Sequence, residues 1–213
     1  CEIHPWDQEE KILQNFKPAG IILSGGPESV NLDNPPIAPE FLFDLSVPIL
    51  GICYGMQTMA KQLGGKVEAS SEREYGYAEV EPSNSFLLDG LSDNDTGLLK
   101  VWMSHGDRVE SIPEGFVASA SSKNSPFAVM EDTKRKFFGL QFHPEVTHTI
   151  KGREIIDRFV HEICGCLHEW TPSNIASEAI KEVKAKVGDG EVLLGLSGGV
   201  DSSVVAAILH NAI

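Results

Sequence analysis

The chain has few basic residues and no long apolar run. Its 213 residues include 17 Lys and Arg against 31 Asp and Glu, a formal net charge of −14. This deficit argues against a surface built to hold nucleic acid or an anionic membrane. No segment approaches the roughly 18 apolar residues of a membrane span, and no secretory signal is visible. We therefore expect neither nucleic acid nor a membrane as a partner.

Cysteine is also scarce. The four cysteines are at positions 1, 53, 164 and 166, a spacing that fits neither a CxxC pair nor a zinc knuckle. A chain of this size does not need disulfides to be stable. We expect a reducing, cytoplasmic setting and predict no metal site from the spacing of these residues.

What the sequence does contain is a pattern typical of an α/β fold. Short apolar runs at Ile21–Leu23 and Val47–Ile52 predict buried strands, and Tyr54–Leu63 has helical periodicity. We predict a three-layer, flavodoxin-like domain with a mainly parallel sheet. Short β-like pieces predict antiparallel strands added to its edge, at Lys66–Ala69, Tyr77–Val80, Leu98–Met103, Val117–Ala120 and Ala128–Met130. A strand at Phe137–Phe142 and an amphipathic helix at Lys151–Cys164 complete the domain.

A second domain is predicted to begin after a boundary near 165–170. We divide the chain into residues 1–166 and residues 167–213. Thr171 and Pro172 predict the cap and first turn of a helix that ends at Gly188. The apolar run Glu191–Leu196 predicts a strand, followed by a glycine-rich loop and a helix, which would be the first strand-loop-helix of another α/β domain.

The segment Gly51-Ile52-Cys53-Tyr54-Gly55 is the strongest chemical signal in the chain. A cysteine between two glycines, after a buried strand and before a helix, has the layout of a nucleophile elbow. Such a turn holds the nucleophile in a strained pose at a helix N-terminus, where the helix dipole favours a thiolate. We predict Cys53 as a catalytic nucleophile; the alternative is a small buried apolar residue.

His143 and Glu145 are predicted to complete a catalytic triad. In extended backbone, residues i and i+2 point to the same side, so Glu145 can fix the tautomer of the His143 imidazole. Pro144 keeps the segment extended. The set Cys53, His143 and Glu145 supplies a nucleophile, a base and an orienting carboxylate. His105 is the competing histidine, and we expect a structural or pocket-lining role for it.

Two further sets of residues are candidates for binding. Backbone N–H groups of the Gly25-Gly26 turn and of Tyr54 are predicted to form an oxyanion hole, although the turn alone is also compatible with a simple tight turn. Farther on, a loop rich in glycine and serine follows an apolar run and opens a helix, which favours binding of a phosphate. Its residues are Ser197, Gly198, Gly199, Val200, Asp201, Ser202 and Ser203.

Four segments together resemble a class I glutamine amidotransferase. They are residues 24–27 (Ser-Gly-Gly-Pro), 51–57 (Gly-Ile-Cys-Tyr-Gly-Met-Gln), 103–107 (Met-Ser-His-Gly-Asp) and 141–145 (Gln-Phe-His-Pro-Glu). The resemblance implies hydrolysis of glutamine to glutamate and ammonia through a thioester on Cys53. It also implies that Gln57 holds the amino-acid end of the substrate. Members of the family begin with a strand and helix that this chain does not contain.

The loop at 197–203 resembles the pyrophosphate-binding loop of the ATP pyrophosphatase family. The fusion of the two parts resembles glutamine-dependent synthetases that adenylate xanthosine 5′-monophosphate (XMP) and let ammonia displace AMP. The resemblance implies ATP, Mg²⁺ and XMP as ligands, and a homodimer formed through a region beyond Ile213. The alternatives are an amidotransferase that serves another synthase and a non-catalytic regulatory module.

Overall fold

The computed structural model describes residues 1–169 and 171–213, and the side chains of these residues except Ser71 and Glu72. The described chain divides into two compact units, Cys1–Cys166 and Leu167–Ile213. The first unit holds every strand of the described chain.

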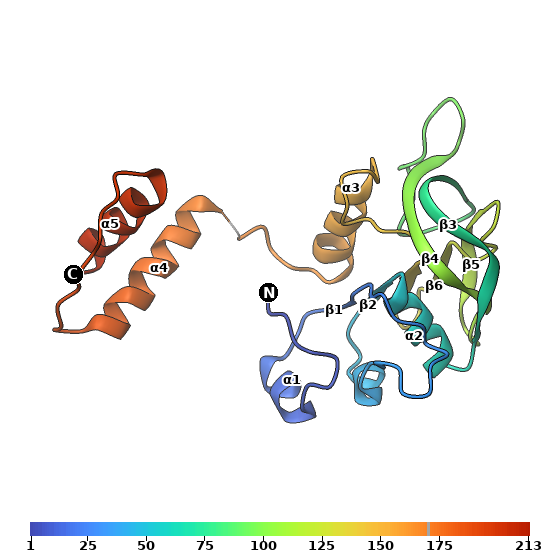
Figure 1. The fold of residues 1–213 in the computed structure, drawn as a ribbon, viewed down its shortest axis with the longest axis horizontal. Coiled ribbons are helices and arrows are strands. Elements are labelled where there is room, and N and C mark those ends of the chain that lie inside the picture. Colours follow the sequence, from blue (N-terminus) through green and yellow to red (C-terminus); the bar gives the residue numbers. More distant parts are fainter. Residues whose placement is uncertain (170) are drawn as a thin grey trace. The chain divides into compact units, whose positions relative to one another are not determined.

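The first unit is built on one seven-stranded sheet with the order β1-β2-β7-β6-β5-β3-β4 (Figure 1). Strands β1 (Ile21–Leu23), β2 (Ile49–Ile52) and β7 (Phe137–Leu140) are parallel, with Leu23 opposite Gly51 and Gly51 opposite Gly139. Every residue of β2 and β7 is buried, as expected of parallel strands covered on both faces. The predicted α/β fold class is confirmed.

The prediction of a mainly parallel sheet is wrong in one respect: among the described residues the sheet is mixed, and four of its six strand pairings are antiparallel. Strands β6 (Val129–Asp132), β5 (Val117–Ser122), β3 (Lys66–Pro82) and β4 (Leu99–Ser111) extend the sheet from β7 by antiparallel pairing. The two short pieces expected at Lys66–Ala69 and Tyr77–Val80 are parts of the single long strand β3. The pairing of β3 with β4 is irregular between Ala69 and Glu74. Such an irregularity interrupts the alternation of apolar and polar residues, so the sequence pattern did not indicate one continuous strand.

Helices cover both faces of the sheet (Figure 1). On one face α2 (Tyr54–Gln62) contributes Met56 and Met59 to a cluster that contains Ile49 of β2. On the other face Ile155 and Phe159 pack in a second cluster with Leu50, Ile52, Phe138 and Leu140. Alternate side chains of β2 therefore pack against the helices on opposite faces of the sheet. The helix, sheet and helix layers form the three-layer arrangement that was predicted.

The helix expected over Lys151–Cys164 consists of two parts. It begins as α3 (Gly152–Asp157) and continues as η2, a π-helix at Arg158–Ile163. The predicted apolar face is present, because Ile155, Phe159 and Ile163 are buried. Two short helices were not predicted: α1 (Glu10–Phe16), which has no buried residue, and η1 (Glu40–Asp44), with only Leu42 buried.

The second unit consists of the helices α4 (Pro172–Val187) and α5 (Val200–Ala212). The predicted start of α4 is confirmed: Thr171 is the N-cap, and its hydroxyl accepts a hydrogen bond from the backbone N–H of Asn174 at 3.2 Å. The predicted boundary segment 165–170 includes Trp170, which lies outside the described residues.

The predicted strand at Glu191–Leu196 is wrong. These residues have no regular secondary structure, and Leu193 is fully exposed. A β-strand is stabilised by hydrogen bonds to a neighbouring strand, and no described segment pairs with this one. An apolar run alone was therefore not sufficient to define a strand.

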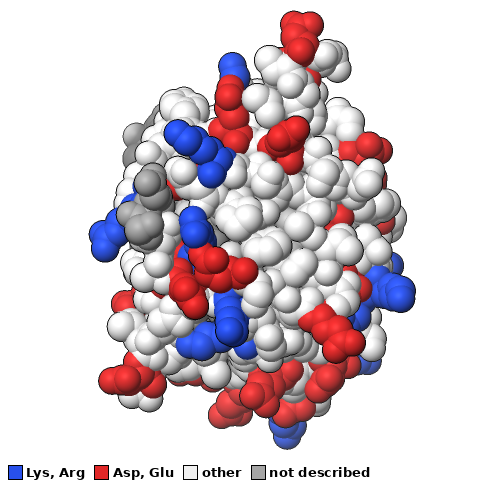
Figure 2. All heavy atoms as spheres, turned by 90° about the vertical axis from the view of Figure 1, so that its right-hand side faces the viewer, with Lys and Arg blue, Asp and Glu red and all other residues white. Residues whose placement is uncertain are grey.

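Charged side chains are mixed on the face shown in Figure 2, where Lys and Arg stand among Asp and Glu without forming a continuous basic patch among the described residues. In the described part of the chain, no helix is both long enough and apolar enough to cross a membrane.

Candidate active site

Cys53 lies in a strained turn between β2 and α2. Its backbone has φ 49° and ψ −104°, in the region that residues other than glycine rarely adopt. It is the N-cap residue of α2, and its backbone N–H donates to the Leu140 carbonyl at 2.7 Å. This hydrogen bond ties the elbow to the end of β7. The side chain is buried but sits where the helix dipole favours negative charge.

The two glycines of the elbow are required by the packing around them. A Cβ at Gly55 would overlap the carbonyl group of Leu23, and a Cβ at Gly51 would lie 2.7 Å from backbone atoms of Gly55. Neither has the positive φ that favours glycine. These residues therefore let β1, β2 and α2 approach closely enough to hold Cys53 in its turn.

His143 and Glu145 follow the end of β7 and interact directly. Nδ1 of His143 lies 2.6 Å from Oε1 of Glu145. The backbone around His143 is fixed as well: its N–H donates to the Trp102 carbonyl at 3.0 Å, and its carbonyl accepts from the Thr149 hydroxyl at 2.6 Å. The carboxylate thus orients an imidazole whose backbone is held by β4.

The electrostatics of this group favour the imidazolium. The neighbouring Cys53 side chain and the carboxylate of Glu145 raise the pKa of His143 to about 10, although burial opposes the shift. Burial is the largest single influence on Glu145 and would raise its pKa, but the hydrogen bond with His143, a hydrogen bond from its own backbone and the charge of His143 together outweigh burial, and the net shift is downward. His143 is therefore positioned to carry a proton at neutral pH.

Cys53 and His143 are close, but they do not form an aligned hydrogen bond. Nε2 of His143 is buried and has no hydrogen-bond partner among the described residues. Sγ of Cys53 lies instead 3.6 Å from the Ser104 carbonyl oxygen. The largest influence that raises the pKa of His143 is nevertheless a hydrogen-bonding interaction with the Cys53 side chain, so the two groups are within reach of each other although their hydrogen bond is not aligned. Catalytic hydrogen bonds are often loose before substrate binds.

The Gly25-Gly26 turn passes beside the same group. A Cβ at Gly25 would lie 3.1 Å from Cε1 of His143 and 3.8 Å from Cβ of Cys53. A Cβ at Gly26 would lie 3.6 Å from the Tyr54 ring. The backbone of this turn therefore approaches the nucleophile closely, as an oxyanion loop must.

Tyr54 and Gln57, on the first turns of α2, are both buried. The Tyr54 hydroxyl donates to the Pro36 carbonyl at 2.6 Å; burial and then the charge of Glu28 raise its pKa. Nε2 of Gln57 lies 2.7 Å from the Asp107 carbonyl oxygen and 3.4 Å from Oε1 of Gln141. The Gln57 amide is thus engaged by the protein itself.

Three neighbours of the triad were assigned no role from the sequence, although two of them lie in the segments 103–107 and 141–145 that carry the family resemblance. They are Ser104 and Trp102, which contribute carbonyl groups from β4, and Gln141, whose Nε2 lies 3.8 Å from Sγ of Cys53. Gln141 is fully buried and stands two residues before His143. A polar residue at the end of a fully buried strand was a signal that could have identified it.

His105 is not placed to act as the base. Its Nε2 lies 3.1 Å from Oε2 of Glu74, and its Nδ1 lies 3.0 Å from the Asp107 carbonyl oxygen. Both nitrogens are engaged, and the side chains of His105 and Glu74 are buried. This agrees with the structural role expected of it.

In the second unit, the glycine-rich loop wraps the first turn of α5. Gly198 has φ +83°, and Gly199 is the N-cap residue. The hydroxyls of Ser202 and Ser203 donate to the Gly199 carbonyl at 3.0 and 2.8 Å, and the hydroxyls of Ser197 and Ser202 are 3.0 Å apart. The predicted binding residues 197–203 are thus gathered at one helix N-terminus, where anions are stabilised.

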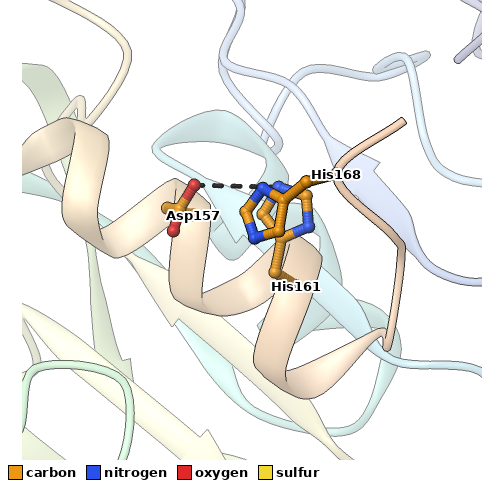
Figure 3. A group of neighbouring side chains, drawn as sticks. All are labelled: Asp157, His161 and His168. Carbon is orange, nitrogen blue, oxygen red and sulfur yellow. Dashed lines mark ion pairs between the residues drawn. The ribbon is translucent and has the colours of Figure 1, made fainter. Parts of the chain in front are cut away.

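A separate pair of polar side chains lies on the helix after β7. Figure 3 shows Asp157 and His161, four residues apart on α3 and η2, with Nε2 of His161 3.7 Å from Oδ1 of Asp157. Nδ1 of His161 lies 2.6 Å from the Cys166 carbonyl oxygen. His168, drawn with them, belongs to the second unit.

The family of this chain is shown by comparison with known proteins. The family described as Glutamine amidotransferase class-I matches residues 1–163, and the family described as NAD synthase matches residues 173–213. The chain belongs to the class I glutamine amidotransferase family.

Its curated relatives include proteins named GMP synthase [glutamine-hydrolyzing]. The chain is 57% identical to the one from Shewanella amazonensis over 219 aligned positions and 59% identical to the one from Ectopseudomonas mendocina over 218. Each alignment covers all of this chain and 42% of the relative. The chain therefore spans about two fifths of the length of these relatives.

Solved structures agree with the fold. A Thermoplasma acidophilum protein described as a candidate component of GMP synthase is similar with a TM-score of 0.55 and 32% identity, over 59% of this chain and 61% of that one. A glutamine amidotransferase from Thermotoga maritima has a TM-score of 0.52 over 90% of this chain and 78% of its own. At 24% identity, the second similarity concerns the fold alone.

Proposed function

We propose that this chain carries the glutaminase half of a glutamine-hydrolysing GMP synthase. Cys53 is the nucleophile, His143 the acid and base, and Glu145 the residue that orients the imidazole. The observation that carries the proposal is the strained Cys53 turn beside a His143–Glu145 pair 2.6 Å apart. Its support from relatives is the high identity to proteins named GMP synthase over the whole chain.

The reaction begins with attack of the Cys53 sulfur on the side-chain amide carbon of glutamine. A tetrahedral intermediate forms, and its oxyanion is stabilised by the backbone N–H groups of Gly26 and Tyr54, with Gly25 shaping the turn. His143 gives its proton to the leaving nitrogen, and ammonia departs. A γ-glutamyl thioester remains on Cys53. His143 then removes a proton from water, which hydrolyses the thioester to glutamate.

We assign residues 1–166 to the glutaminase domain and residues 167–213 to the beginning of the ATP-dependent domain. The loop residues Ser197–Ser203 are proposed to bind the phosphates of ATP through backbone N–H groups at the start of α5. Gln57 is assigned to the glutamine pocket.

Mg²⁺ prefers carboxylate and phosphate oxygens, and Asp201 in the first turn of α5 offers the single carboxylate of this loop. Asp201 is exposed, so it can reach a cation that ATP phosphates also bind. In the complete enzyme, ATP adenylates XMP with release of pyrophosphate, and ammonia then displaces AMP to give GMP. We place this enzyme in the cytoplasm and expect it to form a homodimer.

The proposal predicts a separation of activities in the complete enzyme. Cys53→Ala should abolish glutamine-dependent GMP synthesis and leave ammonia-dependent synthesis intact, because only the nitrogen donor step uses Cys53. Asp201→Asn should impair ATP consumption and leave glutamine hydrolysis measurable. Glutamine-dependent synthesis that survives in Cys53→Ala would refute the assignment of the nucleophile. Equal loss of both activities in Asp201→Asn would refute the division into two sites.

A further inference from the structure

A chain of buried polar groups connects β4 to the nucleophile, and its orientation is set by a backbone carbonyl. The Asp107 carbonyl oxygen can only accept hydrogen bonds. Gln57 presents Nε2 to it at 2.7 Å, so this end of the Gln57 amide must be the NH₂ group. Nδ1 of His105 approaches the same oxygen at 3.0 Å and must also donate. The Gln57 amide therefore cannot be reversed without placing two carbonyl oxygens against each other.

The orientation of Gln57 in turn fixes that of Gln141. The same Nε2 of Gln57 lies 3.4 Å from Oε1 of Gln141, so the Gln141 amide directs its oxygen toward Gln57. Its NH₂ group consequently faces Cys53, with Nε2 3.8 Å from Sγ. Gln141 is fully buried and Gln57 is 3% exposed, so water does not compete for these contacts.

Sγ of Cys53 therefore lies near one hydrogen-bond acceptor and one hydrogen-bond donor. The Ser104 carbonyl oxygen, 3.6 Å away, accepts a hydrogen bond from the thiol and would repel a thiolate. The Gln141 amide, by contrast, donates to sulfur and favours the thiolate. A hydrogen bond to the charged form of an acidic group lowers its pKa. The site thus contains one contact for each protonation state of the sulfur.

We infer that Gln141 is a positioning residue for the proposed reaction: its side-chain amide, held in one orientation by Gln57 and the Asp107 carbonyl, stabilises the Cys53 thiolate. This inference deepens the proposed function and rests on it, since the thiolate is the attacking species. The alternative is that the two amides only satisfy each other in the core.

Other groups also influence the charge on Cys53, and a test must hold them constant. Among the titratable side chains on the elements around it are His143 with Glu145 after β7, His105 and Asp107 on β4, Glu74 on β3, and Tyr54 on α2. The Asp107 carboxylate accepts a hydrogen bond from Ser29. None of these side chains is changed by a substitution at position 141.

The test is the pH dependence of Cys53 alkylation in the longest available form of the protein. Iodoacetamide reacts with the thiolate, and the modified peptide that contains Cys53 is measured by mass spectrometry, separately from the other three cysteines. Gln141→Leu removes the donor at similar volume, and Gln141→Glu replaces it with a carboxylate. Gln57→Met keeps the Gln141 amide as a donor but removes the Gln57 amide that fixes the orientation of Gln141. Ser119→Ala is the matched control, because Ser119 is also fully buried and polar and lies on β5.

We expect Gln141→Leu to raise the midpoint of the alkylation profile by about one pH unit, the size expected for loss of a hydrogen bond to a charged group. Gln141→Glu should raise it further, because two negative charges then face each other. Gln57→Met should give a smaller shift in the same direction, and Ser119→Ala none. For glutamine hydrolysis at neutral pH, Gln141→Leu should lower kcat about tenfold at unchanged KM.

Unchanged midpoints in Gln141→Leu and Gln141→Glu, with the far-ultraviolet circular dichroism of the unmodified protein, would overturn the inference. If one of these variants does not fold, the other together with Gln57→Met decides. Alkylation reports on the sulfur alone, so a failure of the proposed function would be seen separately, as absence of glutamine hydrolysis by the unmodified protein.

Discussion

The side chains of His143 and Glu145 meet on the same side of the backbone although Pro144 stands between them, with Nδ1 of the imidazole 2.6 Å from Oε1 of the carboxylate. Because Nδ1 is engaged by the carboxylate, Nε2 is the ring nitrogen that remains for proton transfer in the proposed reaction. Thr149 and Trp102 hold the backbone of His143 on both sides. The pair is therefore oriented by local geometry before any substrate binds.

Glu145→Gln should reduce glutamine hydrolysis roughly a hundredfold or more, the range of a positioned acid and base. The amide keeps the shape but removes the charge that helps to raise the pKa of His143 to about 10. The descent of kcat at alkaline pH, where the imidazolium loses its proton, should therefore move to lower pH. A pH profile between 6 and about 10.5 measures it. An alkaline limb that does not move would contradict the assigned role of Glu145.

The charge on His143 should also contribute to stability in a defined pH range. Its folded pKa of about 10 lies above the ordinary histidine value of 6.5, so the folded state binds the proton more tightly. The contribution is fully present below the unfolded pKa and is lost as the pH rises through the folded value. The difference in unfolding free energy between the unmodified protein and His143→Gln should therefore shrink between about pH 6 and about pH 10.5, as measured with urea. A difference that grows with pH would show that the shift has the opposite sign.

Gly55→Ala should destabilise the protein by about 3 kcal/mol or more, because the new Cβ would meet the Leu23 backbone. Gly64→Ala is the matched comparison. Gly64 has φ +97° and nothing within 4 Å of its added Cβ, so only backbone strain of about 1–2 kcal/mol is expected. Urea unfolding of both variants measures the difference. Equal costs would mean that β1 and α2 are not in close contact at the elbow.

Cys164 should be much less reactive than Cys53. Burial, and then the charge of Cys166, raise the pKa of Cys164 to about 11, so little thiolate is present at about pH 8. Peptide mapping after brief alkylation should find Cys53 modified well before Cys164, with exposed Cys1 as an internal reference. Faster modification of Cys164 would indicate that the end of η2 opens readily.

Features that are determined by residues adjacent in the chain could be predicted from the sequence. The elbow is an example: glycines at 51 and 55 between an apolar run and a helical pattern specified the turn, and the structure shows the strain and the close backbone approach. The cap at Thr171 is another, since the cap and the first-turn proline are adjacent in the chain.

Features that depend on distant partners were not predictable in the same way. The continuity of β3 through residues 69–74 depends on pairing with β4, and the run 191–196 lacks a strand to pair with among the described residues. The change from α3 to a π-helix at Arg158 has no signal that we identified in the sequence. Ser104 and Trp102 approach the triad because β4 passes beside Cys53 and His143, and Gln141 approaches Cys53 because β7 pairs with β2.

The most direct test of the account is to trap the covalent intermediate. Protein mixed with glutamine and quenched in acid within the first turnovers should carry one γ-glutamyl group on the peptide that contains Cys53, as detected by mass spectrometry. Cys53→Ala should carry none and should not release ammonia. Hydrolysis of glutamine at an undiminished rate by Cys53→Ala, or an adduct on another residue, would show that Cys53 is not the nucleophile.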